Sequence, residues 1–229
     1  GKKLISYHEY NEEKTSEKII SYLEEGREVA LVTDAGMPCI SDPGYILVEK
    51  IKKAELPITT LPGANAGLTA LVASGIESYN YTFYGFLPRK SKDLKLKLEE
   101  ILKMNTTSIL YESPYRVKNI VEEISKISPT RKISVARELT KMFEQIETSS
   151  AEEILEMLGN KIKEKGEFVV IISPNKDEKS EEVNVDELVE LIYQKVQSGV
   201  KKSEAIKNIA KEFGINKKEV YSLYHEKYD

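Results

Sequence analysis

The chain has 229 residues, of which 40% are hydrophobic and 31% are charged, and its formal net charge at pH 7 is -4. This composition is typical of a folded globular protein, and the acidic balance argues against a protein that coats nucleic acid with its whole surface. No apolar run is long enough to cross a membrane and no signal-peptide pattern begins the chain, so we expect a cytoplasmic protein without a membrane partner.

The residues that usually bind structural metals are scarce. Cys39 is the single cysteine, and the two histidines, His8 and His225, lie far apart in the sequence. The spacing of these three residues does not match a zinc site, and one cysteine cannot form an internal disulfide. We therefore expect no metal centre.

Strand-like and helix-like segments alternate along most of the chain, which predicts an α/β fold. We expect a first lobe over residues 1–77 and a second lobe over residues 78–175, with the aromatic stretch SYNYTFYGFLPRK crossing between them. In the first lobe, the patterns predict strands at 4–7, 28–33 and 57–61 and helices at 14–25 and 42–53, with a third helix that ends near residue 74.

The second lobe shows the same alternation. Its patterns predict helices at 93–103, 115–127 and 151–165 and strands at 107–111, 132–136, 144–148 and 167–172. Ser149 or Ser150 is expected to cap the helix that begins at residue 151. Residues 176–185 read as a charged linker, and residues 186–229 as an appendage of three short helices that resembles a helix-turn-helix unit.

Four loops of unusual composition each follow a predicted strand. They are TDAGMPCISDPG after Val32, PGANAG after Leu61, ESPYR after Tyr111 and RELTK after Ala136. In open α/β sheets, ligands bind where the C-terminal ends of the strands meet, so we expect these loops to form one site.

The first two of these loops indicate what kind of ligand to expect. Gly36, Gly44 and Gly63 allow close approach of the backbone to a ligand, as a nucleotide-like molecule requires. Neither GxGxxG nor GxxxxGK[ST] occurs there, so the ligand should carry little or no phosphate. Asp34 and Asp42 fit this expectation, because a carboxylate accepts hydrogen bonds from ribose hydroxyls and favours a cation.

Five motifs, DAGMPCISDPG, LPGANAGLTALVASG, FYGFLPRK, ILYESPYR and VARELTKMFEQ, occur in the order and spacing of the tetrapyrrole methylase superfamily. Within it, the chain resembles the bacterial small-subunit ribosomal RNA (cytidine-2′-O)-methyltransferases over residues 3–173, and the C-terminal helices resemble that family's usual appendage. Members usually begin with a strand, a Pro-Ile-Gly-Asn loop and an acidic segment, which do not precede Lys3 here. We therefore expect the two-lobed fold to lack its front strand and loop, with activity in doubt for that reason.

The resemblance implies that S-adenosylmethionine binds in the cleft between the lobes. Its sulfonium is a cation without phosphate, which agrees with the acidic, glycine-rich loops. The cofactor-binding residues that the resemblance implies are Asp34, Ala35, Gly36, Pro38, Ile40, Ser41, Asp42, Pro62, Gly63, Ala64 and Asn65.

Methyl transfer to a ribose 2′-hydroxyl requires in-line positioning and a group that takes the proton or stabilises the oxyanion. As catalytic residues we would test first Glu112, Arg137, Glu138 and Lys141, with a salt-bridged interface between the lobes as the alternative interpretation. Arg89, Lys90 and Arg116 are expected to contact RNA phosphates.

The implied partners are small-subunit ribosomal RNA, free or in the assembled subunit, and a second copy of the chain in a homodimer. Two other functions stay open at this point. One is a porphyrinoid C-methyltransferase of cobalamin or sirohaem synthesis, and the other is a ligand-sensing regulator that binds nucleic acid through the C-terminal helices.

Overall fold

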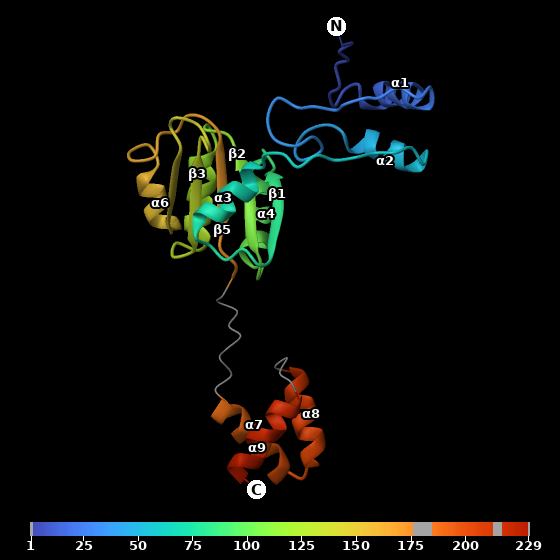
Figure 1. The fold of residues 1–229 in the computed structure, drawn as a ribbon. Helices are drawn as coiled ribbons and strands as arrows, with labels where there is room; N and C mark the ends of the chain where they lie inside the picture. Colours follow the sequence, from blue (N-terminus) through green and yellow to red (C-terminus); the bar gives the residue numbers. More distant parts are fainter. Residues whose placement is uncertain (1, 176–184, 213–216, 229) are drawn as a thin grey trace. The chain divides into compact units, whose positions relative to one another are not determined.

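The computed structural model describes residues 2–175, 185–212 and 217–228, which divide into two compact units, Gly1–Pro174 and Asn175–Asp229 (Figure 1). None of the helices in these residues is both long and apolar enough to span a membrane. The predicted linker lies almost wholly outside the described residues. The predicted division of the first unit at residue 77 stays a prediction.

A mixed sheet of five strands organises the second half of the first unit, in the order β1-β2-β5-β3-β4. β1 pairs with β2 in parallel, whereas the other three pairings are antiparallel. Because β5 runs opposite to β2 and β3, the C-terminal ends of β1, β2 and β3 lie at one edge of the sheet. The strands are β1 (Tyr81–Phe86), β2 (Thr107–Glu112), β3 (Lys132–Arg137), β4 (Gln145–Ser150) and β5 (Phe168–Ile172).

Helices cover both faces of this sheet (Figure 1). On one face, α3 (Ala66–Ser74) packs Leu71 against Ile109 and Ile171. On the other face, α4 (Ser91–Leu102), α5 (Val117–Ile127) and α6 (Ala151–Met157) bury the larger core, which includes Leu98 and Ile120. The α/β class and the positions of most elements after residue 90 are therefore confirmed.

Two details of the second lobe differ from the sequence prediction, and one further prediction is confirmed. β1 lies in the stretch interpreted as a crossing segment, and a bulge between Phe83 and Gly85 obscures its alternation. α6 ends at Met157 because Gly159 has a φ of 85° and Leu158 bridges to Ile162. The capping prediction is confirmed, since Ser150 Oγ accepts a hydrogen bond from the Glu153 N–H.

Before α3, the described residues of this unit, 2–65, form two helices and no strand. α1 (Glu12–Glu24) and α2 (Tyr45–Lys53) pack around Ile19, Leu47 and Ile51. α2 begins three residues later than predicted because Gly44, with a φ of 143°, precedes it.

The predicted strands at 4–7, 28–33 and 57–61 are wrong, because these segments form no ladder in the described residues. Leu31 packs on the α1–α2 pair, but its neighbour Val32 is 80% exposed and Leu61 is 79% exposed. Parallel sheets are buried on both faces, and here helices cover only one side of the segments.

The second unit is a bundle of α7 (Val185–Gln197), α8 (Lys202–Glu212) and α9 (Lys217–Tyr228). It has its own core, which includes Ile192, Ile206 and Val220. Three helices are observed where three were predicted.

Candidate cofactor and substrate site

Loops 33–44 and 62–65 lie against each other. A Cβ atom added to Gly36 would lie 3.5 Å from the Ala64 carbonyl oxygen, and one added to Gly63 would lie 3.1 Å from Met37 Cγ. Gly36 has a φ of 76°, which favours glycine, whereas a side chain at Gly63 would have to displace Met37 slightly. The sequence prediction that these loops come together agrees with this contact, although neither loop follows a strand.

The same loops adjoin the C-terminal ends of β1 and β2. The Gly67 N–H, at the start of α3, donates a hydrogen bond of 3.1 Å to the Tyr111 hydroxyl. A Cβ atom on Gly85 would lie 3.4 Å from Ser41 Oγ. Phe83 packs edge-on to Tyr111 with a ring-centroid distance of 5.0 Å. Three of the four predicted loops, 33–44, 62–65 and 113–116, thus gather beside one pair of strand ends.

Left-handed backbone conformations concentrate in the predicted site loops. Cys39 and Ser41 have φ angles of 69° and 62°, and Glu138 and Thr140 have φ angles of 50° and 62°. Each such conformation costs a non-glycine residue roughly 1–2 kcal/mol, and strain of this kind gathers at ligand-binding sites. The strain therefore supports a functional role for loops 33–44 and 138–144.

The polar groups of the first two loops suit a cationic ligand better than a phosphate. Neither loop 33–44 nor loop 62–65 contains Lys, Arg or His. Asp34 is exposed, whereas Asp42 Oδ2 accepts a hydrogen bond of 3.1 Å from Thr33 Oγ1. Asn65 Oδ1 accepts the Leu68 N–H at 2.9 Å and so caps α3. A role of Asn65 toward a cofactor would therefore use its backbone.

Glu112 and Arg116 form a partly buried ion pair at the end of β2. Glu112 is 3% exposed, and its Oε2 lies 3.6 Å from Arg116 Nη1 without a hydrogen bond. The guanidinium donates hydrogen bonds to the carbonyl oxygens of Leu87, at 3.3 Å, and Pro88, at 2.8 Å. Arg116 thus ties the segment after β1, which carries Arg89 and Lys90, to the start of α5.

Arg137, Glu138 and Lys141 form a second group at the end of β3. Arg137 Nε donates to the Lys165 carbonyl at 2.5 Å, and its Nη1 donates to the Phe143 carbonyl at 3.1 Å. Lys141 Nζ lies 3.0 Å from Glu138 Oε1 and 2.9 Å from Glu167 Oε2. These residues join the loop after β3 to the loop before β5.

The register of the sheet relates the two groups. Glu112 and Arg137 are both paired with Phe168, on opposite sides of β5. Glu112 and Arg137 therefore share one edge and one face of the sheet, whereas Glu138 and Lys141 lie in the loop after β3. The four predicted catalytic residues form two networks separated by a strand. Their catalytic roles, and the roles predicted for the cofactor-binding and RNA-binding residues, stay predictions.

Tyr111 and Gly85 contact the gathered loops, although neither was among the predicted site residues. The bulge at Gly85 was the signal that was missed. Within the described residues, no group of three or more His, Cys, Asp or Glu side chains is arranged to hold a metal ion.

The Glu138 network predicts a pH dependence of stability. The hydrogen bond from the Glu167 N–H, followed by the one from Lys141, holds the pKa of Glu138 below its usual value. A depressed carboxyl pKa adds stability above the unfolded-state pKa, near 4.3, and that stability is lost as the pH falls through the folded-state pKa. The Glu138→Gln variant should therefore be less stable than the parent chain in urea at pH 7. This difference should shrink as the pH falls below the unfolded-state pKa, and a difference that stays constant as the pH falls would contradict the assignment.

The comparisons with known proteins agree with the fold. The family pattern of the Tetrapyrrole (Corrin/Porphyrin) Methylases matches residues 4–155, more than half of the chain. The structure is similar to the methyltransferase CobJ, with a TM-score of 0.52 and 21% identity over 70% of each chain. It is also similar to diphthine synthase, with a TM-score of 0.53 and 11% identity over 76% of this chain and 70% of that one. Fold and family pattern together define the tetrapyrrole methylase class.

Curated relatives narrow the assignment. The ribosomal RNA small subunit methyltransferases I of Halalkalibacterium halodurans and Bacillus subtilis are each 40% identical to the chain. Both alignments cover 98% of this chain and 78% of the relative. The chain belongs to the ribosomal RNA small subunit methyltransferase I family.

Proposed function

We propose that the chain transfers a methyl group from S-adenosylmethionine to the 2′-hydroxyl of a cytidine ribose in small-subunit ribosomal RNA. The observation that carries the proposal is the meeting of loops 33–44 and 62–65, which lack cationic side chains, beside the ends of β1 and β2 in a chain of this family. A ribosomal RNA substrate also implies a cytoplasmic location.

The chemistry of these loops fits the methyl donor. A sulfonium ligand brings one positive charge and no phosphate, so the exposed carboxylate of Asp34 attracts it. Close approach of backbone at Gly36 and Gly63 suits the ligand's adenosine part. The other residues predicted to bind the cofactor belong to the same two loops. When bound, the cofactor supplies an electrophilic methyl group.

The residues of the chain then have to position the acceptor hydroxyl and accept its proton. Alignment of the acceptor oxygen with the methyl carbon can supply most of the acceleration. Glu112 lies at the end of β2, beside the gathered loops, and its Oε2 is buried without a hydrogen bond, although its side chain lies on the opposite face of the strand from Tyr111. We propose Glu112 as the residue that accepts the proton or orients the hydroxyl, with Arg89 and Lys90 binding phosphates of the RNA.

A methyl-transfer assay tests this function. The chain is incubated with tritiated S-adenosylmethionine and, separately, with free small-subunit ribosomal RNA, the assembled small subunit and a porphyrinoid. Label in either RNA sample is the expected result, and the comparison of those two samples identifies the physiological substrate. Label in the porphyrinoid alone would contradict the proposal and support the C-methyltransferase alternative.

We further propose that the protein is a homodimer, as is usual in the tetrapyrrole methylase superfamily that the chain resembles. Apolar side chains on α3 and β1 support this, because Val72 is 82% exposed and Phe86 is 60% exposed. Light scattering should give a mass of twice 26.0 kDa. A mass of 26.0 kDa across the micromolar range would contradict the dimer.

A further inference from the structure

Arg137 links two loops at the edge of the sheet where β3 ends and β5 begins. Its guanidinium donates hydrogen bonds to the Phe143 carbonyl at 3.1 Å and to the Lys165 carbonyl at 2.5 Å. Arg137 itself is 8% exposed, so these bonds are largely shielded from water. We call residues 138–144 and 159–167 the Arg137-linked loops.

Further contacts hold the same two loops together. Glu138 Oε1 accepts the Glu167 N–H at 3.0 Å. Lys141 Nζ donates hydrogen bonds to the side-chain carboxylates of Glu138 and Glu167. A Cβ atom on Gly166 would lie 2.4 Å from Glu138 Oε1, so the backbone of one loop presses directly on a side chain of the other. These contacts fix the positions of the side chains that the loops expose.

The acidic side chains around these loops are engaged in contacts within the protein. Glu144 Oε2 accepts the Thr140 N–H, Glu147 pairs with Lys161 at 2.7 Å, and Glu164 lies 3.8 Å from Lys118. With Glu138 and Glu167 bonded to Lys141, each of these carboxylates has a partner. Four of these five carboxylates therefore lie beside a lysine, and Glu138 and Glu167 share Lys141.

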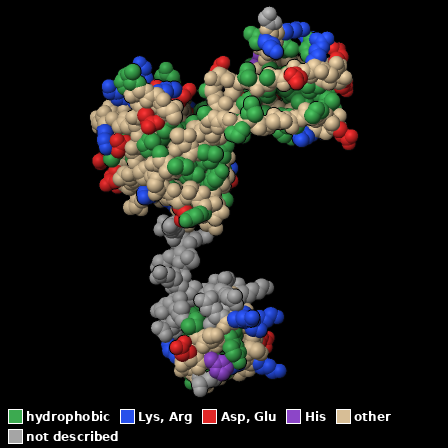
Figure 2. All heavy atoms as spheres, in the orientation of Figure 1, with side chains coloured by type: hydrophobic (Ala, Val, Ile, Leu, Met, Phe, Trp, Pro, Cys, Tyr) green, Lys and Arg blue, Asp and Glu red, His purple; other side chains and the backbone are tan. Residues whose placement is uncertain are grey.

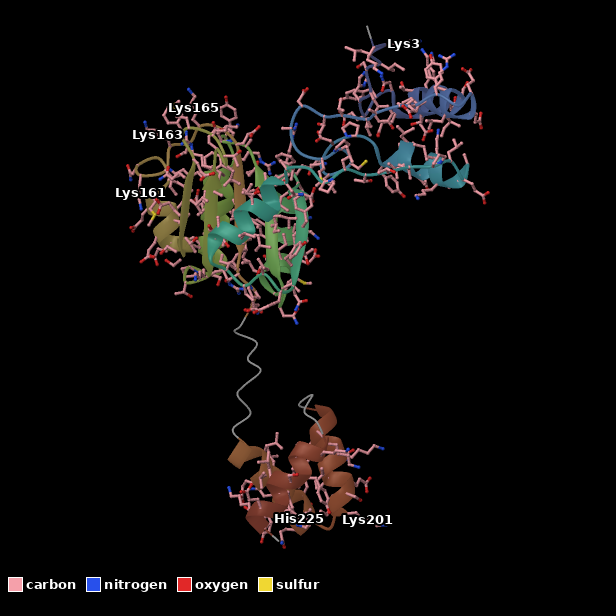
Figure 3. All side chains as sticks on the ribbon, viewed as in Figure 1. Lys3, Lys161, Lys163, Lys165, Lys201 and His225 are labelled. Carbon is pink, nitrogen blue, oxygen red and sulfur yellow. The ribbon has the colours of Figure 1, made fainter. Side chains whose placement is uncertain are left out.

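Two cations and two large apolar side chains face the solvent instead. Lys163 and Lys165 are exposed and form no ion pair within the described residues, and Figure 3 shows both on the loop that also carries Lys161. Met142 is 91% exposed and Phe143 is 67% exposed. Figure 2 shows hydrophobic and basic side chains next to one another at the upper left of the first unit.

This combination suits single-stranded RNA. Exposed aromatic rings stack on bases, and unpaired lysines bind phosphates. A protein partner fits less well, because lysine is depleted in the cores of protein–protein interfaces. Toward β2 the same edge continues into loop 113–116, where Tyr115 is 94% exposed. The surface is thus continuous, through the sheet register, with the end of β2 where Glu112 lies.

We propose that the Arg137-linked loops form an RNA-binding surface, in which Phe143 stacks on a base and Lys163 and Lys165 bind phosphates. The inference rests on the proposed function and extends its substrate contacts beyond Arg89 and Lys90. In this surface Arg137 is a positioning residue, because its guanidinium is bonded to backbone carbonyls of both loops.

The test measures binding of a fluorescein-labelled single-stranded RNA oligonucleotide from small-subunit ribosomal RNA over a range of salt concentrations. The double variant Lys163→Gln/Lys165→Gln should bind about tenfold more weakly, and the slope of log affinity against log salt should decrease by about 1.4, or about 0.7 per lost phosphate contact. Phe143→Ala should bind the RNA more weakly by at least about fivefold. The slope of log affinity against log salt should not change, because stacking releases no counterions.

The matched control is the double variant Lys103→Gln/Lys132→Gln. Both lysines are exposed; Lys103 follows α4 and precedes β2, and Lys132 is the first residue of β3, at the opposite edge of the sheet. This control should bind RNA like the parent chain, and all variants should unfold at the same urea concentration. Unchanged affinity and slope in the Lys163/Lys165 variant would contradict the proposed RNA-binding surface but not the proposed function. A parent chain that binds no RNA but still binds S-adenosylmethionine would overturn the proposed function and the surface together.

Discussion

Replacing Gly44 with alanine is expected to weaken S-adenosylmethionine binding by at least about tenfold, which is about 1.4 kcal/mol. Gly44 has a φ of 143°, a conformation that side chains rarely allow. A Cβ atom there would also lie 2.6 Å from Cys39 Sγ and 3.0 Å from Leu31 Cδ2. The strained φ and the overlap with Cys39 both act on loop 33–44, and Gly44 N itself donates a hydrogen bond to Glu12 Oε1 at 2.9 Å. Isothermal titration calorimetry measures the loss.

Two further variants separate the causes. Gly26 has a φ of 77°, and no atom lies within 4 Å of a Cβ placed there, so Gly26→Ala should cost about 1 kcal/mol of stability and leave cofactor binding unchanged. Adding Cys39→Ala to Gly44→Ala removes the sulfur overlap and should restore part of the affinity. Equal affinity in the Gly44→Ala variant and the parent chain would show that loop 33–44 does not shape the cofactor site.

Replacing Arg116 with alanine should lower the free energy of unfolding of the first unit by about 3 kcal/mol. The change leaves the carboxylate of Glu112 buried without its ion pair and removes the hydrogen bonds to Leu87 and Pro88. It should also raise the KM for RNA more than it lowers kcat, because the released segment carries Arg89 and Lys90. Urea unfolding and steady-state methyl transfer measure the two effects.

A double-mutant cycle with Glu112→Gln distinguishes a buried pair from a surface contact. The neutral amide removes the unpaired charge, so the double variant should be more stable than Arg116→Ala alone by about 1 kcal/mol or more. A loss below about 0.5 kcal/mol for Arg116→Ala would instead be the behaviour of an exposed ion pair. If Glu112 accepts the proton from the ribose hydroxyl, Glu112→Gln should lower kcat with cofactor affinity unchanged.

Local patterns in the sequence were sufficient to predict that the helices form, although not all of their ends. The apolar repeat that predicts a helix at 115–127 corresponds to α5, which buries Ile120 and Ile124 completely. Strand formation depends in addition on a hydrogen-bonded neighbour and on cover for both faces. Residues 28–33 have a strand-like pattern, but Val32 is left exposed and no ladder forms in the described residues. Edge strand β1 was missed because its bulge at Gly85 interrupts the alternation.

The meeting of the loops was predictable, but the contacts between them were not. The meeting of loops 33–44 and 62–65 was inferred from strands at 28–33 and 57–61 that do not form in the described residues. The type of ligand, inferred from the glycines, aspartates and missing cations of these loops, stays a prediction. The bond between Gly67 and Tyr111 joins residues 44 positions apart, and the bonds of Arg116 to Leu87 and Pro88 depend on the pairing of β1 with β2. Such contacts follow from the assembled sheet, and no local pattern indicates them.

Hydrogen-exchange mass spectrometry of the chain with and without S-adenosylmethionine tests the cofactor site most directly. The account predicts that the cofactor slows exchange in peptides that cover residues 33–44 and 62–67. Peptides from α4, which covers the face of the sheet opposite α3, and from β4, at the far side of the sheet order from β1, should be unaffected. Unchanged exchange in both loops at saturating cofactor, or slower exchange only elsewhere, would contradict it.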